Sequence, residues 1–124
     1  MIAVEVKGRD PKCTWEIVGI YRAPNEDMRV IERLAARADS LGNFTKRSII
    51  AGDLNLPYAD WNGNVQWTSG GQESANESGY TQVVNNSTRG DALLDVYLVR
   101  PGNLFTSCSF IQGISDHCGV LLEV

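Results

Sequence analysis

The sequence predicts an α/β protein with a mixed β-sheet and one long helix that crosses between parallel strands. Residues 2–7 alternate apolar and polar side chains, which is the period of a half-exposed strand. Residues 25–42 repeat apolar side chains at helical spacing, between strand-like segments at residues 13–21 and 48–51. A strand, a helix and a strand in this order predict a crossover unit. With 124 residues, the chain is expected to form one domain at most.

The composition indicates an ordered globular protein and limits its partners. The chain is 43% hydrophobic, carries a net charge of −4 and has no long apolar run that could span a bilayer. An acidic chain lacks a broad basic surface, so binding to nucleic acid would need a locally basic face or a divalent cation. The three cysteines form neither a CxxC pair nor a ligand cluster. We therefore expect an intracellular protein with free thiols and no membrane partner.

The first half of the chain reads as a hairpin followed by the long helix. Residues 8–12, with their Pro and Gly, predict a turn between the first two strands. Asn25 is the predicted N-cap of the helix, and Gly42 is its predicted end. The apolar positions of the helix are expected to face the core, and they are Met28, Ile31, Leu34, Ala35, Ala38 and Leu41.

The second half contains a long polar loop and three further strands. Residues 58–79 are rich in Gly, Ser and Asn and predict an ordered loop, while residues 73–85 show a weak helical period. Apolar runs predict strands at residues 93–99, 104–111 and 119–124. The sheet is therefore expected to take strands from both halves of the chain.

Polar side chains occur at the ends of several predicted strands. Asp53 and Asn55 follow a buried strand, and in extended backbone residues two apart point to the same side. Asp95 is the single acid in an apolar strand, where an unpaired carboxylate would be costly. Asp116 and His117, the only histidine, directly precede the last strand. Each motif alone is compatible with a turn, but together they predict one polar site.

Four segments in this order resemble the endonuclease/exonuclease/phosphatase superfamily. They are Y-R-A-P-N at residues 21–25, A-G-D-L-N-L-P at 51–57, T-R-G-D-A-L-L-D-V-Y-L-V at 88–99 and S-D-H at 115–117. The superfamily includes apurinic/apyrimidinic endonucleases, pancreatic deoxyribonuclease and inositol phosphate phosphatases. The segments are most similar to the endonuclease domain of non-LTR retrotransposons, in which T-R-G-x-x-L-L-D is familiar. The resemblance covers nearly the whole chain.

The resemblance implies a hydrolytic role for four of these residues. Asp53 would orient or deprotonate the attacking water, and Asn55 would help to position the water and the scissile phosphate. His117 would donate a hydrogen bond to a phosphate oxygen and stabilise charge in the transition state. Asp95 would hold the imidazole and keep it charged. These residues together would catalyse hydrolysis of a phosphodiester.

Three further residues receive binding roles from the resemblance. Asp116 would bind Mg²⁺ or Mn²⁺ directly or contact one of the metal's ligands, since hard cations prefer carboxylates and water. Tyr21 would bind the phosphate through its hydroxyl, although it is equally compatible with core packing. Arg89, with Thr88, would either touch the substrate or cap the following strand.

The chain departs from the family at its amino-terminal end. In the family, the domain begins well before the strand at residues 2–7, and the earlier half carries an Asn and the Glu that is the principal metal ligand. Neither Glu5 nor Glu16 lies at an equivalent place in the strand order. Residues 1–124 are therefore expected to form a partial domain, half of a four-layer α/β-sandwich of the deoxyribonuclease I-like type. Its exposed sheet face would be covered by the missing half or by a homodimer.

The resemblance predicts the DNA-nicking endonuclease module of a retrotransposon endonuclease/reverse transcriptase, in the nucleus if it acts on chromosomal DNA. Two alternatives stay open. One is a catalytically inactive half-domain with a structural or oligomerisation role, and the other is a phosphatase of the same superfamily. An upstream strand that bears the metal-binding Glu would favour the nuclease, and the T-R-G-x-x-L-L-D segment favours it over a phosphatase.

Overall fold

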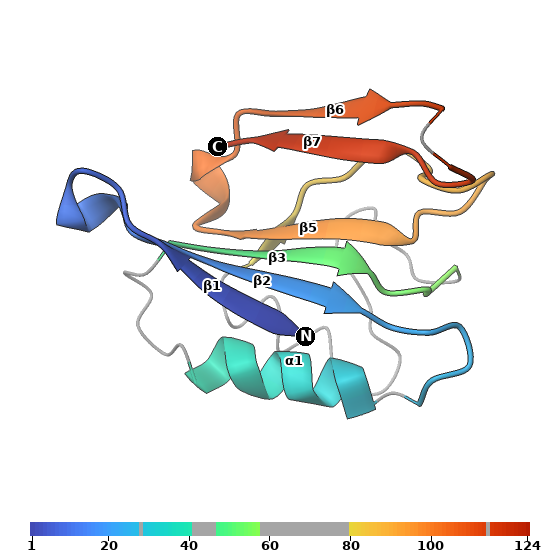
Figure 1. Ribbon diagram of the computed structural model, residues 1–124, viewed down its shortest axis with the longest axis horizontal. Coiled ribbons are helices and arrows are strands. Elements are labelled where there is room, and N and C mark those ends of the chain that lie inside the picture. The colour runs from blue at the N-terminus through green and yellow to red at the C-terminus, as the bar shows by residue number, and fades with distance from the viewer. Residues whose placement is uncertain (28, 41–46, 58–79, 114) are drawn as a thin grey trace.

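In the part of the chain that it describes, a computed structural model shows two sheets and one α-helix (Figure 1). The structure describes residues 1–27, 29–40, 47–57, 80–113 and 115–124. The elements are β1 (Ile2–Val6), β2 (Trp15–Tyr21), α1 (Arg29–Ser40), β3 (Arg47–Asp53), β4 (Thr81–Gln82), β5 (Asp95–Arg100), β6 (Ser107–Ile111) and β7 (Gly119–Glu123), with short 3₁₀ turns at Pro11–Cys13 and Gly102–Leu104. The predicted loop at residues 58–79 and the predicted helix end at Gly42 lie outside the described residues.

The larger sheet is mixed, as the sequence predicts. Its strand order is β1-β2-β3-β5-β4, and β6 pairs with β7 in a separate two-stranded sheet. Strands β2 and β3 are parallel and α1 lies between them in the chain, while all other strand pairs are antiparallel. The α/β class and the first hairpin are thereby confirmed.

Three predicted boundaries are wrong. The helix begins at Arg29, whose backbone N–H donates to Asp27 Oδ1 at 3.0 Å, so Asp27 rather than Asn25 supplies the cap. Residues 81–82 form β4 and not part of a helix, because they pair with β5. Strand β5 begins at Asp95 rather than at residue 93. The Asp95 carboxylate therefore lies at the end of the sheet and not inside an apolar strand.

The core lies between the larger sheet and α1. Alternate residues of β2, β3 and β5 point to this side, and Leu34 of α1 packs against them. The buried cluster comprises Val18, Ile20, Leu34, Ile50, Leu54, Tyr80, Val96 and Leu98. Burial of apolar area at roughly 25 cal/mol per Å² makes this layer the main source of stability.

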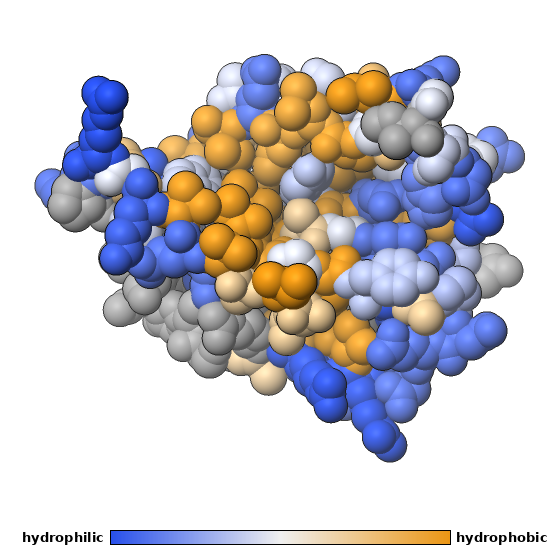
Figure 2. Space-filling model, viewed as in Figure 1, coloured by the Kyte–Doolittle hydropathy of each residue, from blue (hydrophilic) through white to orange (hydrophobic). Residues whose placement is uncertain are grey.

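The opposite face of the sheet is covered only in part. Tyr97 of β5 donates its hydroxyl to the Val120 carbonyl at 3.0 Å, which fastens the β6–β7 hairpin beside β5. Over β1 and β2 the same face is exposed, and its apolar side chains are Ile2, Val4, Val6 and Ile17. Figure 2 shows apolar side chains gathered across the middle of one face of the molecule. The fold thus leaves apolar surface that a sheet normally buries.

The three cysteines, Cys13, Cys108 and Cys118, all lie in the described part of the chain and are free thiols. Among the described residues, no helix has the length and apolar character needed to cross a membrane.

Candidate functional site

The strand register aligns three polar side chains at one end of the larger sheet. Tyr21 of β2 is the neighbour of Asp53 on β3, and Asp53 is the neighbour of Asp95 on β5. Directly opposed residues of paired strands project to the same face, so these side chains form a row. Tyr21 is 63% exposed, which excludes the core-packing alternative for this residue. Its ring is therefore available to a ligand.

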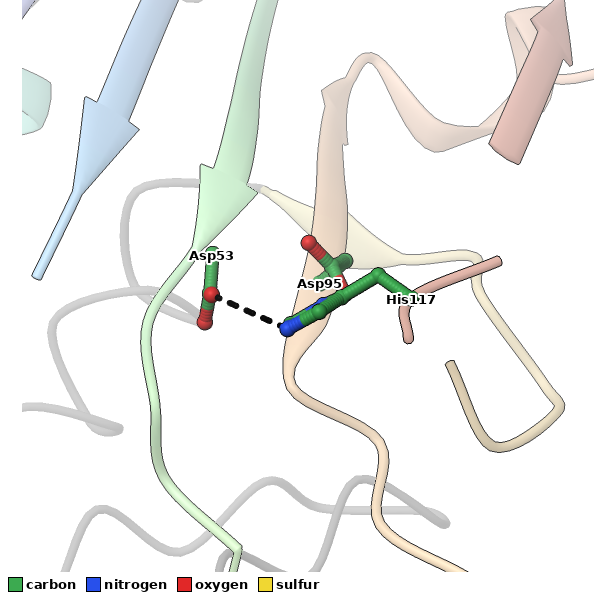
Figure 3. Close-up of side chains that lie close together, drawn as sticks. All are labelled: Asp53, Asp95 and His117. Atoms are coloured by element: carbon green, nitrogen blue, oxygen red, sulfur yellow. Dashed lines mark hydrogen bonds and ion pairs between the residues drawn. The ribbon is translucent and has the colours of Figure 1, made fainter. Parts of the chain in front are cut away.

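The β6–β7 connection brings His117 to this row (Figure 3). His117 Nδ1 lies 2.8 Å from Asp95 Oδ2, and its Nε2 lies 3.9 Å from Asp53 Oδ2. The three side chains are 15–26% exposed, so solvent and a ligand can reach them. Residues far apart in the sequence thus meet at one point, as the sequence analysis expected of Asp53, Asp95 and His117.

The pKa of His117 is raised above its ordinary value of 6.5. The hydrogen bond with Asp95 is the main cause, and the charges of Asp95, Asp53 and Asp116 add to it, while partial burial opposes it. Near neutral pH the imidazole is therefore charged more often than that of a free histidine. A protonated ring with Nδ1 held by Asp95 keeps its Nε2–H as a hydrogen-bond donor on the Asp53 side.

Asn55 does not lie beside Asp53 in the extended manner that its spacing predicts. Strand β3 ends at Asp53, and Asn55 has a φ of +46°, a left-handed conformation that Asn tolerates better than most residues. Its N–H donates to Asp53 Oδ1 at 2.9 Å, and its Nδ2 donates to the Arg22 carbonyl at 2.7 Å. The turn thus fixes both side chains through hydrogen bonds instead of through strand geometry.

Arg22 is a buried residue that the sequence analysis left without a role. Its guanidinium donates to the carbonyls of Leu54 at 3.3 Å, Asn55 at 3.1 Å and Glu26. Its N–H also donates to the Asp53 carbonyl at 2.9 Å. Arg22 therefore fastens the Asp53–Asn55 turn to the end of β2. The available signal was a basic residue placed directly after an apolar strand, inside the Y-R-A-P-N segment.

Asp116 and Arg89 form an ion pair at the edge of the site. Arg89 Nη2 lies 3.0 Å from Asp116 Oδ2, and both side chains are about half exposed or more. Asp116 is not a member of the cluster that Asp53, Asp95 and His117 form in the described part of the chain. The metal role of Asp116 and the substrate role of Arg89 stay predictions, and each of these residues has the other as its partner.

The donor set of the cluster suits a hard cation in part. Asp53, Asp95 and His117 each offer one ligand atom, and these atoms lie within 4.8 Å of one another. Carboxylate oxygens suit Mg²⁺, but His117 Nδ1 is engaged by Asp95 and a protonated imidazole is not a ligand. The carboxylates of Asp53 and Asp95 are thus the groups of this cluster that suit such an ion, with water and further carboxylates as the other ligands.

The chain shares its fold with a solved structure, the endonuclease domain of TRAS1, a telomere-specific non-LTR retrotransposon. The TM-score is 0.74 at 20% sequence identity, and the match covers 98% of this chain and 59% of that chain. That protein is of the kind that the four sequence segments resemble. No family model and no curated protein matches the sequence. The chain therefore has the fold of this endonuclease domain and spans less than two thirds of its length.

Proposed function

We propose that this chain is part of a DNA-nicking endonuclease that hydrolyses phosphodiesters with Mg²⁺. The observation that carries the proposal is the cluster of Asp53, Asp95 and His117 at one end of the larger sheet, with an imidazole between two carboxylates. The shared fold with a retrotransposon endonuclease domain adds support. By this reading the chain belongs to the endonuclease part of a retrotransposon polyprotein that also contains a reverse transcriptase.

In the proposed mechanism, Asp53 orients the attacking water and accepts its proton. Asp53 is fixed for this role, because its Oδ1 accepts the N–H of Asn55 while its Oδ2 faces His117. Asn55 helps to position the water and the scissile phosphate. General base catalysis by a positioned side chain contributes typically about 10²–10⁴-fold in rate.

On the other side of the phosphate, His117 donates from Nε2 to a phosphate oxygen as negative charge develops. Asp95 holds the imidazole through Nδ1, and the resulting rise in the pKa of His117 keeps the ring protonated. Tyr21 extends the same row and binds the phosphate through its exposed hydroxyl. The sheet would thus present the base and the donors from one edge.

A magnesium ion would be held by Asp116, directly or through a water molecule, with its further ligands supplied by water and by other carboxylates. The bound ion would act as a Lewis acid that polarises the phosphoryl group and neutralises its charge. The cation would also favour binding, because a chain with net charge −4 needs either a divalent cation or a locally basic face to bind the phosphate backbone. Mn²⁺ has similar ligand preferences and is expected to substitute.

The active form is expected to have the exposed apolar face over β1 and β2 covered. Ile2, Val4, Val6 and Ile17 lie on this face, and the chain spans 59% of the endonuclease domain with which it shares its fold. An amino-terminal segment with a second sheet would cover the face, and without it two copies are expected to associate there.

The association can be tested by sedimentation of purified protein over a range of concentrations. Val4→Glu is expected to weaken self-association by at least tenfold. Ala3→Glu is the matched control, because Ala3 is exposed on the same strand but points to the other face. Equal effects of both variants would contradict the proposed contact.

Nicking of supercoiled plasmid with Mg²⁺ tests the activity, with the covered form and the isolated chain assayed in parallel. Asp53→Asn and His117→Ala are each expected to lower the rate by about 10²-fold or more. Glu32→Gln, an exposed carboxylate on α1, is the control and should nick at the wild-type rate. Nicking that both site variants retain would refute the proposed site.

A second candidate is an inactive half-domain that serves in structure or assembly. The observation that favours it is the 59% span of the related domain. It predicts stable association without nicking at any protein or Mg²⁺ concentration, even when the apolar face is covered. Release of phosphate from soluble monoesters without plasmid nicking would instead indicate a phosphatase.

A further inference from the structure

Thr88 is a fully buried polar residue next to the site, and its side chain and its backbone groups form hydrogen bonds with main-chain groups. Its Oγ1 accepts the N–H of Leu94 at 3.0 Å and that of Asp95 at 3.1 Å. Its carbonyl accepts the N–H of Cys118 at 2.7 Å. Its own N–H donates to the Ala92 carbonyl at 2.9 Å, which closes the turn before β5.

These bonds connect the two segments that carry the imidazole and its carboxylate. The hydroxyl holds the backbone of Asp95 itself, and the carbonyl holds the residue that follows His117. The side chains of Asp95 and His117 then meet at 2.8 Å. Within the described part of the chain, Thr88 is therefore the residue that forms hydrogen bonds with the main chain of both segments.

We propose that Thr88 is a positioning residue that sets the distance and orientation between Asp95 and His117. The catalytic meaning of this role rests on the proposed function, but the positioning itself does not. A hydroxyl oxygen has two lone pairs, and here both are used by main-chain donors in a site that water does not reach. Serine can supply the same oxygen, whereas isosteric valine leaves both donors without an acceptor.

The neighbouring ion pair between Arg89 and Asp116 is a second connection between the turn at Thr88 and the segment that carries His117. It joins the residue after Thr88 to the residue before His117. Both side chains are well exposed, so solvent screens the pair and its contribution is small. The buried hydrogen bonds of Thr88 are thus expected to dominate, and loss of the ion pair alone should leave the imidazole in place.

Three variants test the role, namely Thr88→Val, Thr88→Ser and the control Thr81→Val on the exposed residue of β4. The ¹⁵N spectrum of the imidazole reports only His117, because the chain has a single histidine. In the neutral ring of the wild type, the proton is expected on Nδ1, which Asp95 binds. In Thr88→Val this proton should shift toward Nε2, which is its usual site in a histidine exposed to water. Thr88→Ser and Thr81→Val should keep the wild-type spectrum.

Amide exchange gives the second readout in the same samples. The N–H groups of Leu94 and Asp95 are expected to lose protection at least tenfold in Thr88→Val and to regain it in Thr88→Ser. Under the proposed function, kcat for nicking should fall about 10–100-fold in Thr88→Val with KM nearly unchanged. The serine variant should recover most of that loss.

An unchanged His117 spectrum in folded Thr88→Val would overturn the proposal. If Thr88→Val does not fold, amide exchange in the wild type tests the proposal instead. Exchange of the Leu94 and Asp95 N–H groups at the rate of unprotected, solvent-exposed amides would also overturn it. The spectra need no substrate. A changed His117 spectrum in Thr88→Val, with no nicking by the wild type or any variant, would therefore reject the proposed function and keep the positioning role.

Discussion

The pairing of β3 with β5 places polar side chains at both of its ends, and the two ends differ in their access to solvent. At one end Ser48 faces Arg100, and at the other Asp53 faces Asp95. Ser48 and Arg100 are buried, Tyr80 donates its hydroxyl to Ser48 Oγ at 2.8 Å, and the Arg100 guanidinium lies 4.7 Å from the Tyr80 ring centroid. Asp53 and Asp95 instead stay partly exposed beside His117.

One strand register thus places a buried hydrogen-bonded contact at one end of the strand pair and a partly exposed cluster of two carboxylates and an imidazole at the other. Buried polar groups stabilise a fold only when their hydrogen bonds are made inside the protein. At the Ser48 end, the Tyr80 hydroxyl and Ser48 Oγ are such partners, and Ser48 and Arg100 are buried from solvent. The Asp53 end keeps charged groups close together in reach of water, which is the arrangement that a hydrolytic site requires.

The largest effect on stability is expected at the Ser48 end. Tyr80→Phe removes the hydroxyl that binds Ser48 and should lower the free energy of unfolding by about 1–3 kcal/mol, because a buried polar group loses its partner. Urea unfolding followed by circular dichroism measures this change. Plasmid nicking per folded molecule should not change. A stability equal to that of the wild type would show that the two ends do not differ in the proposed way.

An intermediate effect is expected on the titration of His117. Asp95→Asn keeps an acceptor for Nδ1 but removes the charge, so the pKa of His117 should fall toward its ordinary value. NMR titration of the single histidine measures this shift. Because folding raises this pKa, the stabilising contribution of His117 is full below about pH 6.5 and is lost as the pH rises through the folded-state value.

The matched variant for this titration is Glu32→Gln, which removes an exposed carboxylate from α1. Its His117 titration should match that of the wild type. If Asp95→Asn also leaves the pKa unchanged, the hydrogen bond between Asp95 and His117 does not control the charge of the imidazole.

The smallest effect is expected for the exposed ion pair beside the site. Arg89→Met should change the free energy of unfolding by about 0–1 kcal/mol, since both partners are well solvated. The difference from the wild type should disappear in 1 M salt, where the Debye length falls to about 3 Å. Urea unfolding at low and high salt measures it. A loss of unfolding free energy as large as that of Tyr80→Phe would mean that the exposed ion pair stabilises the fold as much as the buried hydroxyl does.

Much of the fold and of the site could be predicted from local pattern. Alternation in β1 and the helical period of α1 fixed the class, and the residues at strand ends pointed to Asp53, Asp95 and His117. The turn at Asn55 could not be predicted, because a left-handed residue held by Arg22 depends on contacts between distant segments. The strand β4 was missed for the same reason, since its pairing with β5 outweighs a weak helical period.

The binding roles of Tyr21, Asp116 and Arg89 show the same limit. Sequence similarity suggests what each residue would touch, but the register alone determines that Tyr21 lies in the row with Asp53. The ion pair between Arg89 and Asp116 likewise depends on how the β6–β7 connection meets the turn at residues 88–92. Such partners follow from tertiary packing and not from spacing in the chain.

We propose that the polar cluster at the Asp53 end performs phosphodiester hydrolysis while the cluster at the Ser48 end supports the fold. The most direct test compares Mg²⁺-dependent plasmid nicking by Asp53→Asn and Tyr80→Phe, each normalised to the fraction of folded protein. We expect a loss of about 10²-fold or more in Asp53→Asn and the wild-type rate in Tyr80→Phe. Equal rates in the two variants would contradict it.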